Sequence, residues 1–306
     1  MLSIIQRTVK DTQPRRLPKF KVGSWIHAGN PTEEELRHLA KALKLELGHL
    51  KDGLDVYEVP RLEVERGTIY VFTRVPYRKN GDIVTYPLLL ILAPHHIVTV
   101  SLVTPPFLEK FLNGTTSFYT TQKTKLCLQI FSEITTCYNI FLAEIGKGIR
   151  KTRANIEQLT TEEIARFVLL EEILNDFLSA LVPTNAILQT LLSGKYLRLY
   201  EEDKNLVEDL SLSHGQLIEA CKSHLKTIVN IREAYSTIMT HQLNRVIKLL
   251  TALTIVSAIP TIIASFYGMN VALPLAEHPS AFWIVLSIAI FLSLVILVIF
   301  ARNRWL

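Results

Sequence analysis

The pattern of apolar and polar residues divides the chain into three parts. Up to about residue 114, short β-rich runs alternate with turn signals such as Gly29-Asn30-Pro31. Beyond that point apolar residues recur at steps of three and four, and the last sixty or so residues contain two long apolar spans. The first pattern predicts a mixed α/β layer, the second predicts helices that pack on one another, and the third predicts helices without a polar face.

Four β-rich runs in the first part predict strands, at 25–28, 68–75, 84–92 and 97–103. Between two of them, Asn80-Gly81 predicts a tight hairpin turn, because both residue types accept left-handed backbone. A helix is expected to begin at Pro31, with Asn30 as its cap. The three glutamates at 33–35 then lie in its first turn, where the helix dipole favours negative charge.

The second part predicts long helices, over 121–156, 161–181 and 205–266. Pro183 and Gly194 are expected to interrupt the bundle formed by the first two. The third is a helical sequence of about sixty residues that only Gly215 and Pro260 interrupt, so it predicts a rod roughly 90 Å long. Because this rod continues into the first apolar span, a change in the preceding region can be transmitted mechanically along it.

The two apolar spans, 249–267 and 281–300, predict membrane helices. About twenty apolar residues in a helix cross the roughly 30 Å hydrocarbon core of a bilayer, and neither span contains a charged side chain. Two such spans in tandem are hard to explain as soluble core. The sequence therefore predicts an integral membrane protein.

The charges beside the spans predict its orientation. Four basic residues flank the pair of spans: Arg245, Lys248, Arg302 and Arg304. The connecting loop 271–280 contains no Lys or Arg, and Glu277 is its one acid. The positive-inside rule then places both termini in the cytoplasm and the loop outside. No signal peptide is visible at the start of the sequence, and we expect a multi-pass protein of the cell membrane.

These patterns together predict an α+β cytosolic domain, made of a mixed α/β layer and long helices, followed by a two-helix transmembrane hairpin. The expected parts are a mixed α/β cytosolic domain at 1–115, a helical cytosolic hairpin or bundle at 116–204, a stalk helix continuing into the first membrane helix at 205–267, an external loop at 268–280, and the second membrane helix with a basic cytosolic tail at 281–306.

The net charge of +5 does not predict a nucleic-acid partner. Six basic residues and one acid lie between positions 1 and 25, so the rest of the chain carries no net charge and no basic patch. The three cysteines, Cys127, Cys137 and Cys221, show no paired short spacing. They are expected to be buried, reduced thiols.

The first span has two different faces. Steps of three and four from Ile247 pass through Leu250, Thr254, Ala258, Thr261, Ser265 and Gly268. The other side carries Ile255, Ile259, Ile262, Ile263 and Phe266. The stripe of small and hydroxylated residues fits either a water-filled pore or close packing of membrane helices. A pore requires a homo-oligomer, because two helices per chain cannot enclose a channel. Its neutral oxygens would suit hydrated Mg2+, which dehydrates reluctantly.

A motif at the end of this span carries a family resemblance. Tyr267-Gly268-Met269-Asn270, with Asn244 and 248–251 upstream and the 304–306 terminus, resembles the CorA-type magnesium transporters. Weaker similarity includes Ser24-Trp25-Ile26 and the segment 60–63. The resemblance implies a homopentamer with a funnel-shaped cytosolic domain that moves Mg2+, and often Co2+ or Ni2+, inward.

The resemblance also implies the roles of individual residues. Gly268, Met269 and Asn270 would form the outer mouth, where a ring of Asn270 carbonyl oxygens holds hydrated Mg2+. The pore and gate would be lined by Asn244, Ile247, Leu250, Thr254, Ala258, Thr261 and Ser265. The chain departs from the family in two places: Ile247 stands where Met is common, and the acid often found just after the motif is missing.

Asp52 and Glu233 match the family positions at which cytosolic Mg2+ binds between neighbouring subunits and closes the pore. The resemblance thus implies that both are metal-binding regulatory residues. The other interpretation is that Asp52 is a turn residue, and that Glu233 is a solvated charge on a helix surface.

Other chemistry finds no support in the sequence. Gly146-Lys147-Gly148 lacks the spacing of a phosphate-binding loop and is expected to interrupt a helix, the nine histidines show no compact ligand spacing, and no nucleophile motif occurs. The protein is therefore not expected to be an enzyme. Without ATP, the membrane potential drives influx, and a divalent cation gains roughly 4.6 kcal/mol across about 100 mV. The alternatives are a zinc transporter of the same superfamily and a membrane-tethered adaptor without transport.

Overall fold

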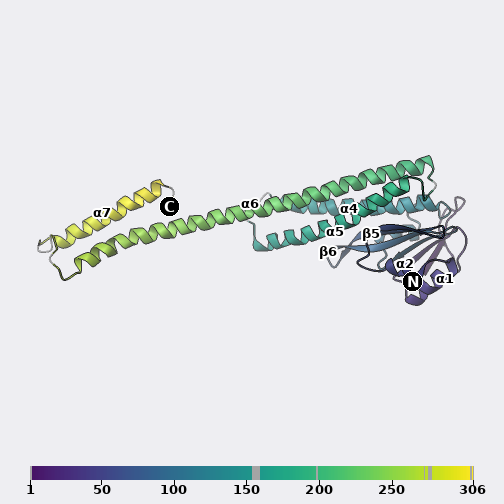
Figure 1. Ribbon diagram of the computed structural model, residues 1–306, viewed down its shortest axis with the longest axis horizontal. Helices are drawn as coiled ribbons and strands as arrows, with labels where there is room; N and C mark the ends of the chain where they lie inside the picture. Colours follow the sequence, from purple (N-terminus) through teal and green to yellow (C-terminus); the bar gives the residue numbers. More distant parts are fainter. Residues whose placement is uncertain are drawn as a thin grey trace. The chain divides into compact units, whose positions relative to one another are not determined.

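The boundary between two structural units falls inside the longest helix of the chain. The computed structural model describes residues 2–153, 159–197, 199–271, 273–274, 278–303 and 305 of the 306-residue chain. By their internal contacts these residues form an N-terminal unit that ends at Asn230 and a C-terminal unit that begins at Ile231. Helix α6 (Glu201–Tyr267) contributes to both units (Figure 1).

Seven strands of the N-terminal unit form one mixed sheet. They are β1 (Leu2–Gln6), β2 (Arg15–Arg16), β3 (Trp25–Gly29), β4 (Arg61–Glu65), β5 (Thr68–Lys79), β6 (Asp82–Leu92) and β7 (Ile97–Ser101). Their order across the sheet is β2-β1-β3-β7-β6-β5-β4. Neighbouring strands are antiparallel except for β3 and β7, which run parallel.

All four predicted strands are confirmed, as β3, β5, β6 and β7. The predicted hairpin turn is also confirmed: Lys79 pairs with Asp82, and Asn80 and Gly81 between them have φ of 52° and 99°. Strands β1, β2 and β4 were not predicted. Two of them, β2 and β4, lie at the edges of the sheet, where only one neighbour selects for a strand pattern.

The predicted start of the first helix is wrong. Helix α1 (Glu33–Leu43) is capped by Thr32, whose hydroxyl accepts a hydrogen bond from the Glu35 N–H at 3.2 Å. The Glu35 carboxylate in turn accepts one from the Thr32 N–H at 3.0 Å. This capping box satisfies two backbone donors at once, whereas Asn30 lies before the helix with a left-handed φ of 40°.

Helices cover both faces of the sheet (Figure 1). On one face, α1 and α2 (Leu47–Asp52) pack on a core that includes Ile26, Leu36, Leu39, Leu50, Tyr70, Phe72, Leu89 and Val98. On the other face, α4 (Lys123–Arg153) and α5 (Thr161–Leu192) contact β5 and β6. The short α3 (Pro106–Leu112) places Phe111 edge-on against the buried ring of Trp25.

Two predicted helix breaks are wrong. Gly146 and Gly148 lie inside α4, and a Cβ added at Gly146 would stand 2.9 Å from Nε2 of His224, so this glycine permits a close approach of helices. Pro183 lies inside α5, next to the buried residues Leu181 and Thr184. Packing on both sides compensates there for the hydrogen bond that proline removes. Gly194, with φ of 71°, follows the end of α5 as predicted.

The long helix of the second part is confirmed. Helix α6 is continuous from Glu201 to Tyr267 and passes through both Gly215 and Pro260. In the N-terminal unit it buries one apolar side, which includes Val207, Leu210, Leu217, Cys221 and Ile228. The final helix, α7 (Ala281–Arg302), begins at the predicted residue. Predicted helix beyond Arg153 falls on residues 154–156, which lie outside the described residues.

Candidate functional site

Three helices among the described residues are long and apolar enough to cross a membrane: the Lys123–Thr152 stretch of α4, α6 and α7. They differ in how much of the apolar stretch the protein itself covers. Half of it is buried in α4, against 6% in α6 and 6% in α7. The apolar residues of α4 therefore belong to the core of the N-terminal unit. Those of α6 and α7 remain available to lipid or to other copies of the chain.

Helix α6 brings the predicted pore residues to one face. At about 100° per residue, the stripe positions from Ile247 to Gly268 fall within an arc of roughly 80°, and Asn244 lies about 40° beyond its edge. Their side chains are exposed, apart from the half-buried Ala258. The face begins with Ile247 and Leu250, which are 50% and 57% exposed, and continues into small and hydroxylated residues. Helical spacing thus places the stripe from Ile247 to Gly268 on one side of α6, whereas its role as a pore lining stays a prediction.

The threonine hydroxyls on this face donate to backbone carbonyl oxygens of the same helix. Thr254 Oγ1 donates to the carbonyl oxygen of Leu250 at 2.8 Å, and Thr261 Oγ1 donates to that of Ser257 at 3.1 Å. Because each hydroxyl hydrogen is used within the helix, the lone pairs of its oxygen remain free to accept. Such acceptors suit the water molecules around a hydrated cation.

The Gly268-Met269-Asn270 segment begins where α6 ends. The Gly268 N–H donates to the carbonyl oxygens of Ala264 at 2.9 Å and Ser265 at 3.3 Å, so the helix closes on this glycine. Asn270 follows in an exposed bend, and its amide has no partner among the described residues. Tyr267 donates its hydroxyl to the carbonyl oxygen of Pro274 at 3.2 Å, which ties part of the loop to the helix end. The predicted loop acid, Glu277, lies outside the described residues.

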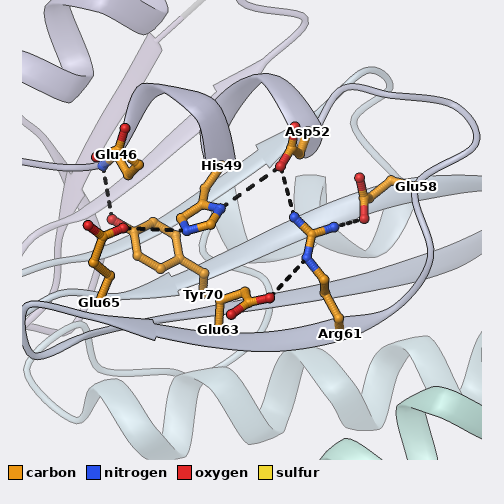
Figure 2. Close-up of polar contacts among 8 residues, drawn as sticks. All are labelled: Glu46, His49, Asp52, Glu58, Arg61, Glu63, Glu65 and Tyr70. Atoms are coloured by element: carbon orange, nitrogen blue, oxygen red, sulfur yellow. Dashed lines mark hydrogen bonds and ion pairs between the residues drawn. The ribbon is translucent and has the colours of Figure 1, made fainter.

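Asp52, the first predicted sensor residue, is the last residue of α2 and is already paired (Figure 2). Its Oδ2 lies 2.8 Å from Nη2 of Arg61 and 3.9 Å from Nδ1 of His49. The interpretation of Asp52 as a simple turn residue therefore does not account for its ion pair with Arg61. Arg61 was not predicted as a functional residue, although the sequence places it directly after Pro60 and between two acids, Glu58 and Glu63.

Figure 2 shows the guanidinium of Arg61 joined to three carboxylates. Beside Asp52 it contacts Glu58 through Nη1, and its Nε lies 3.5 Å from Oε1 of Glu63. Its flat face stacks over the Phe72 ring at 4.0 Å from the centroid. The planar fork of arginine allows these contacts at the same time, which a lysine cannot do.

Arg74 of β5 fixes the loop that leads to this cluster. Its Nη1 donates to the carbonyl oxygens of Val56 at 2.7 Å and Glu58 at 2.9 Å. Its Nε and Nη2 bond the hydroxyl and the carbonyl oxygen of Thr85, both at 2.9 Å. The loop between α2 and β4 is therefore held to the sheet by one side chain.

Glu233, the second predicted sensor residue, is exposed on α6, and its backbone carbonyl oxygen accepts from Thr237 Oγ1 at 3.0 Å. Asp52 belongs to the N-terminal unit and Glu233 to the C-terminal unit. The described residues contain no group of three or more His, Cys, Asp or Glu side chains that could hold a metal ion. Both sensor assignments therefore stay predictions.

The buried cysteines and histidines have structural roles. Burial raises the pKa of Cys127 and of Cys221 to about 12, so these thiols are unreactive. Cys137 is half-buried, and all three cysteines are unpaired, as predicted. His27 is bonded between the hydroxyls of Thr99 at 2.8 Å and Thr104 at 3.1 Å. Burial lowers its pKa to about 4, so it is neutral near pH 7.

Comparison with known proteins agrees with these features. The family model described as CorA-like Mg2+ transporter protein matches residues 20–302. The cobalt/magnesium transport protein CorA of Methanocaldococcus jannaschii is 26% identical over 293 residues, which are 92% of this chain and 90% of that relative. The complete structure of the CorA magnesium transporter from this organism superposes with a TM-score of 0.88 at 21% identity, over 100% of this chain and 99% of the other. The full-length CmaX protein superposes with a TM-score of 0.77 at 17% identity, over 99% and 97%.

Proposed function

Since the chain belongs to the CorA-like Mg2+ transporter family, we propose that it moves divalent metal cations, chiefly Mg2+, across a membrane. Members of this family are transporters, and the chain is therefore not an enzyme. The observation that carries the proposal is the uncharged oxygen-bearing face of α6. It lies on an apolar helix that the protein leaves uncovered, and it ends at Gly268-Met269-Asn270.

The transporting form is a homo-oligomer, a pentamer by family resemblance, in which α6 and α7 form a hairpin in each chain. Two helices per chain cannot enclose a channel, so several copies surround one axis. The striped face of α6 lines the axis, and the uniformly apolar α7 faces lipid. Only 6% of each apolar stretch is buried within the chain, which supports this arrangement. The remaining apolar surface of α6 and α7 is removed from water only by lipid or by further copies of the chain.

The proposed pathway begins at the outer mouth, where Asn270 amide oxygens bind hydrated Mg2+ beside Gly268 and Met269. It continues past the hydroxyls of Thr254 and Thr261, whose lone pairs accept hydrogen bonds from the water shell. It ends at an apolar constriction of Ile247 and Leu250, below which Asn244 lines the exit. An apolar ring stops ions when it is narrow enough to lose its water.

Entry is passive and inward. The membrane potential, negative inside, supplies roughly 4.6 kcal/mol per divalent ion at about 100 mV. The protein lies in the cell membrane with both termini in the cytoplasm, since basic residues flank the spans on one side only. The proposed parts are an α/β domain to residue 115, a helical bundle to 204, a stalk and first membrane helix to 267, an external loop to 280, and then the second membrane helix.

Cytosolic Mg2+ closes the pore by binding at Asp52 and Glu233 of neighbouring subunits. A cation between two carboxylates cancels their repulsion and holds the subunits together, and its loss lets the ring loosen. Uptake is therefore limited by its own product. The exposure of Glu233 and the 43% exposure of the Asp52 side chain leave both carboxylates open to solvent ions.

Uptake by purified protein in liposomes tests the transport proposal. We expect Mg2+ entry that an inside-negative potential accelerates, in competition with Co2+ and Ni2+. Entry of Zn2+ with exclusion of Mg2+ would indicate a zinc transporter instead. No flux of any of these ions from correctly assembled protein would leave a membrane-tethered adaptor.

A further inference from the structure

Arg61 lies where three carboxylates converge, those of Asp52, Glu58 and Glu63 (Figure 2). All three carboxylates therefore share one guanidinium, while the neighbouring Arg74 binds the backbone carbonyl oxygen of Glu58. Within a single chain, the guanidinium of Arg61 is the group that forms the short ion pair with Asp52. A metal ion that binds the Asp52 carboxylate must therefore compete with Arg61 for it.

The position of Arg61 does not depend on Asp52. Its guanidinium stacks over Phe72, and the carboxylate of Glu58, whose side chain is only 13% exposed, contacts Nη1. The backbone at Glu58 is itself held by Arg74. When the contact with Asp52 breaks, Arg61 still has two carboxylates and an aromatic face. It therefore remains within reach and returns when Asp52 becomes free.

The Asp52 carboxylate, by contrast, can change partners. Its side chain is 43% exposed, and both Arg61 and His49 approach the same oxygen, Oδ2. A guanidinium and a hydrated divalent ion compete for such a carboxylate, because both bind through the same carboxylate oxygens, directly or through water.

We propose that Arg61 is a tethered competitor of cytosolic Mg2+ at Asp52. When Mg2+ is scarce, Arg61 neutralises Asp52, and when Mg2+ is abundant the ion displaces it. Because the competitor is part of the chain, its local concentration is fixed, and its strength sets the Mg2+ concentration at which the transporter closes. The inference rests on the proposed sensing role of Asp52.

The test is the inhibition of current by cytosolic Mg2+ in the full-length protein. In Arg61→Gln the competitor is gone, so half-inhibition is expected at a roughly two- to fivefold lower Mg2+ concentration than in the wild type. Arg66→Gln is the matched control. It removes the same charge five residues further along, just after β4, from a side chain that is 82% exposed and whose described ion pair is with Glu65 at 3.8 Å. Its inhibition curve should match that of the wild type.

Two further variants keep the result interpretable. Arg61→Lys keeps the charge but not the planar fork, and it should shift half-inhibition in the same direction by a smaller factor. In an Asp52→Asn background, Arg61→Gln should have no further effect, because the two changes act on one contact.

The outcomes separate this inference from the proposed function. If Arg61→Gln leaves half-inhibition unchanged, or moves it to higher Mg2+, while Asp52→Asn weakens inhibition, Asp52 senses Mg2+ but Arg61 does not compete there. If Asp52→Asn itself leaves the curve unchanged, the sensing role is wrong, and the inference built on it is wrong as well.

Discussion

The polar groups around Asp52 in the N-terminal unit are paired charges, whereas those on the face of α6 in the C-terminal unit are uncharged. Around Asp52, carboxylates and a guanidinium satisfy one another. Along α6, Thr254 and Thr261 satisfy only their hydrogens within the helix and leave their oxygens free. Carboxylates bind a cation more strongly than neutral oxygens do, and a cation held by neutral oxygens is released more readily. The difference fits sensing in one unit and passage in the other.

The largest expected effect comes from removing the amide at the outer mouth. Asn270→Ala takes away the exposed acceptor that follows Gly268, and it should abolish Mg2+ uptake in liposomes while the oligomer still assembles. Asn303→Ala removes the same amide at the end of α7, outside the proposed pathway, and should transport normally. Normal uptake by the Asn270 variant would show that the motif is not part of the pathway, and that ion passage does not depend on these neutral oxygens.

Cysteine labelling distinguishes the two faces of α6. Cysteines at Thr254, Ala258, Thr261 or Ser265 should react with a small water-soluble thiol reagent in the open state, because this face lines water. A cysteine at Ile263, which lies about 180° around the helix from Thr254, should not react at a comparable rate. The buried native thiols, with raised pKa values, give little background. Equal labelling on both faces would favour helix packing or a tether over a pore.

Removing both proposed sensor charges should have a smaller effect. Asp52→Asn with Glu233→Gln keeps the side-chain shapes, and it should raise the Mg2+ concentration for half-inhibition of the current by several-fold, about 1 kcal/mol of weaker ion binding. Asp55→Asn, in the loop that follows α2, is a nearby control. Superimposable inhibition curves for wild type and double mutant would refute the sensor assignment and leave transport untouched.

The smallest effect concerns acid stability, which should differ between the units. Burial lowers the pKa of His27 to about 4, against 6.5 in the unfolded chain, so between these values the unfolded state binds the proton. Stability should therefore fall as the pH drops from 6.5 to 4, by up to about 3 kcal/mol for this residue. The spans 249–267 and 281–300 contain no Asp, Glu, Lys, Arg or His and should not respond.

Fluorescence of the buried Trp25, which shares Thr99 with His27 as a hydrogen-bond partner, follows the unfolding of this unit. His27→Gln should unfold with a shallower pH dependence than the wild type, although with lower stability at pH 7. The exposed His95 provides the control, since His95→Gln should keep the wild-type slope. An unchanged slope in the His27 variant would show that other groups cause the acid sensitivity.

The sequence predicted the elements whose own residues determine them. Strands β5 and β6 contain long apolar runs joined by Asn80-Gly81, and α6 and α7 have helical patterns many turns long, so local chemistry was sufficient. The edge strand β4 reads Arg-Leu-Glu-Val-Glu and depends on β5 for its hydrogen bonds. The break expected at Gly146 failed because His224, far along the chain, packs against that glycine.

The candidate site also has a part that the sequence predicted and a part that it did not. The shared face from Ile247 to Ser265 follows from helical spacing alone, and the structure adds the direction of the threonine hydrogens. The partner of Asp52 did not follow from spacing, because Arg61, nine residues further along, reaches it only through the fold of the intervening loop and its contact with the Phe72 ring. Pairings of this kind depend on three-dimensional contacts that a sequence pattern does not contain.

The hold of Arg74 on the loop before β4 also has a consequence for the order of events during synthesis. Asp52 and Arg61 leave the ribosome before Arg74, and Arg74 is itself oriented by Thr85 on the next strand. The newly made segment 52–61 thus has its charges but not their arrangement until the β5–β6 hairpin has emerged and closed. The arrangement of this ion cluster therefore requires that hairpin, all of which is translated before either apolar span of the C-terminal unit.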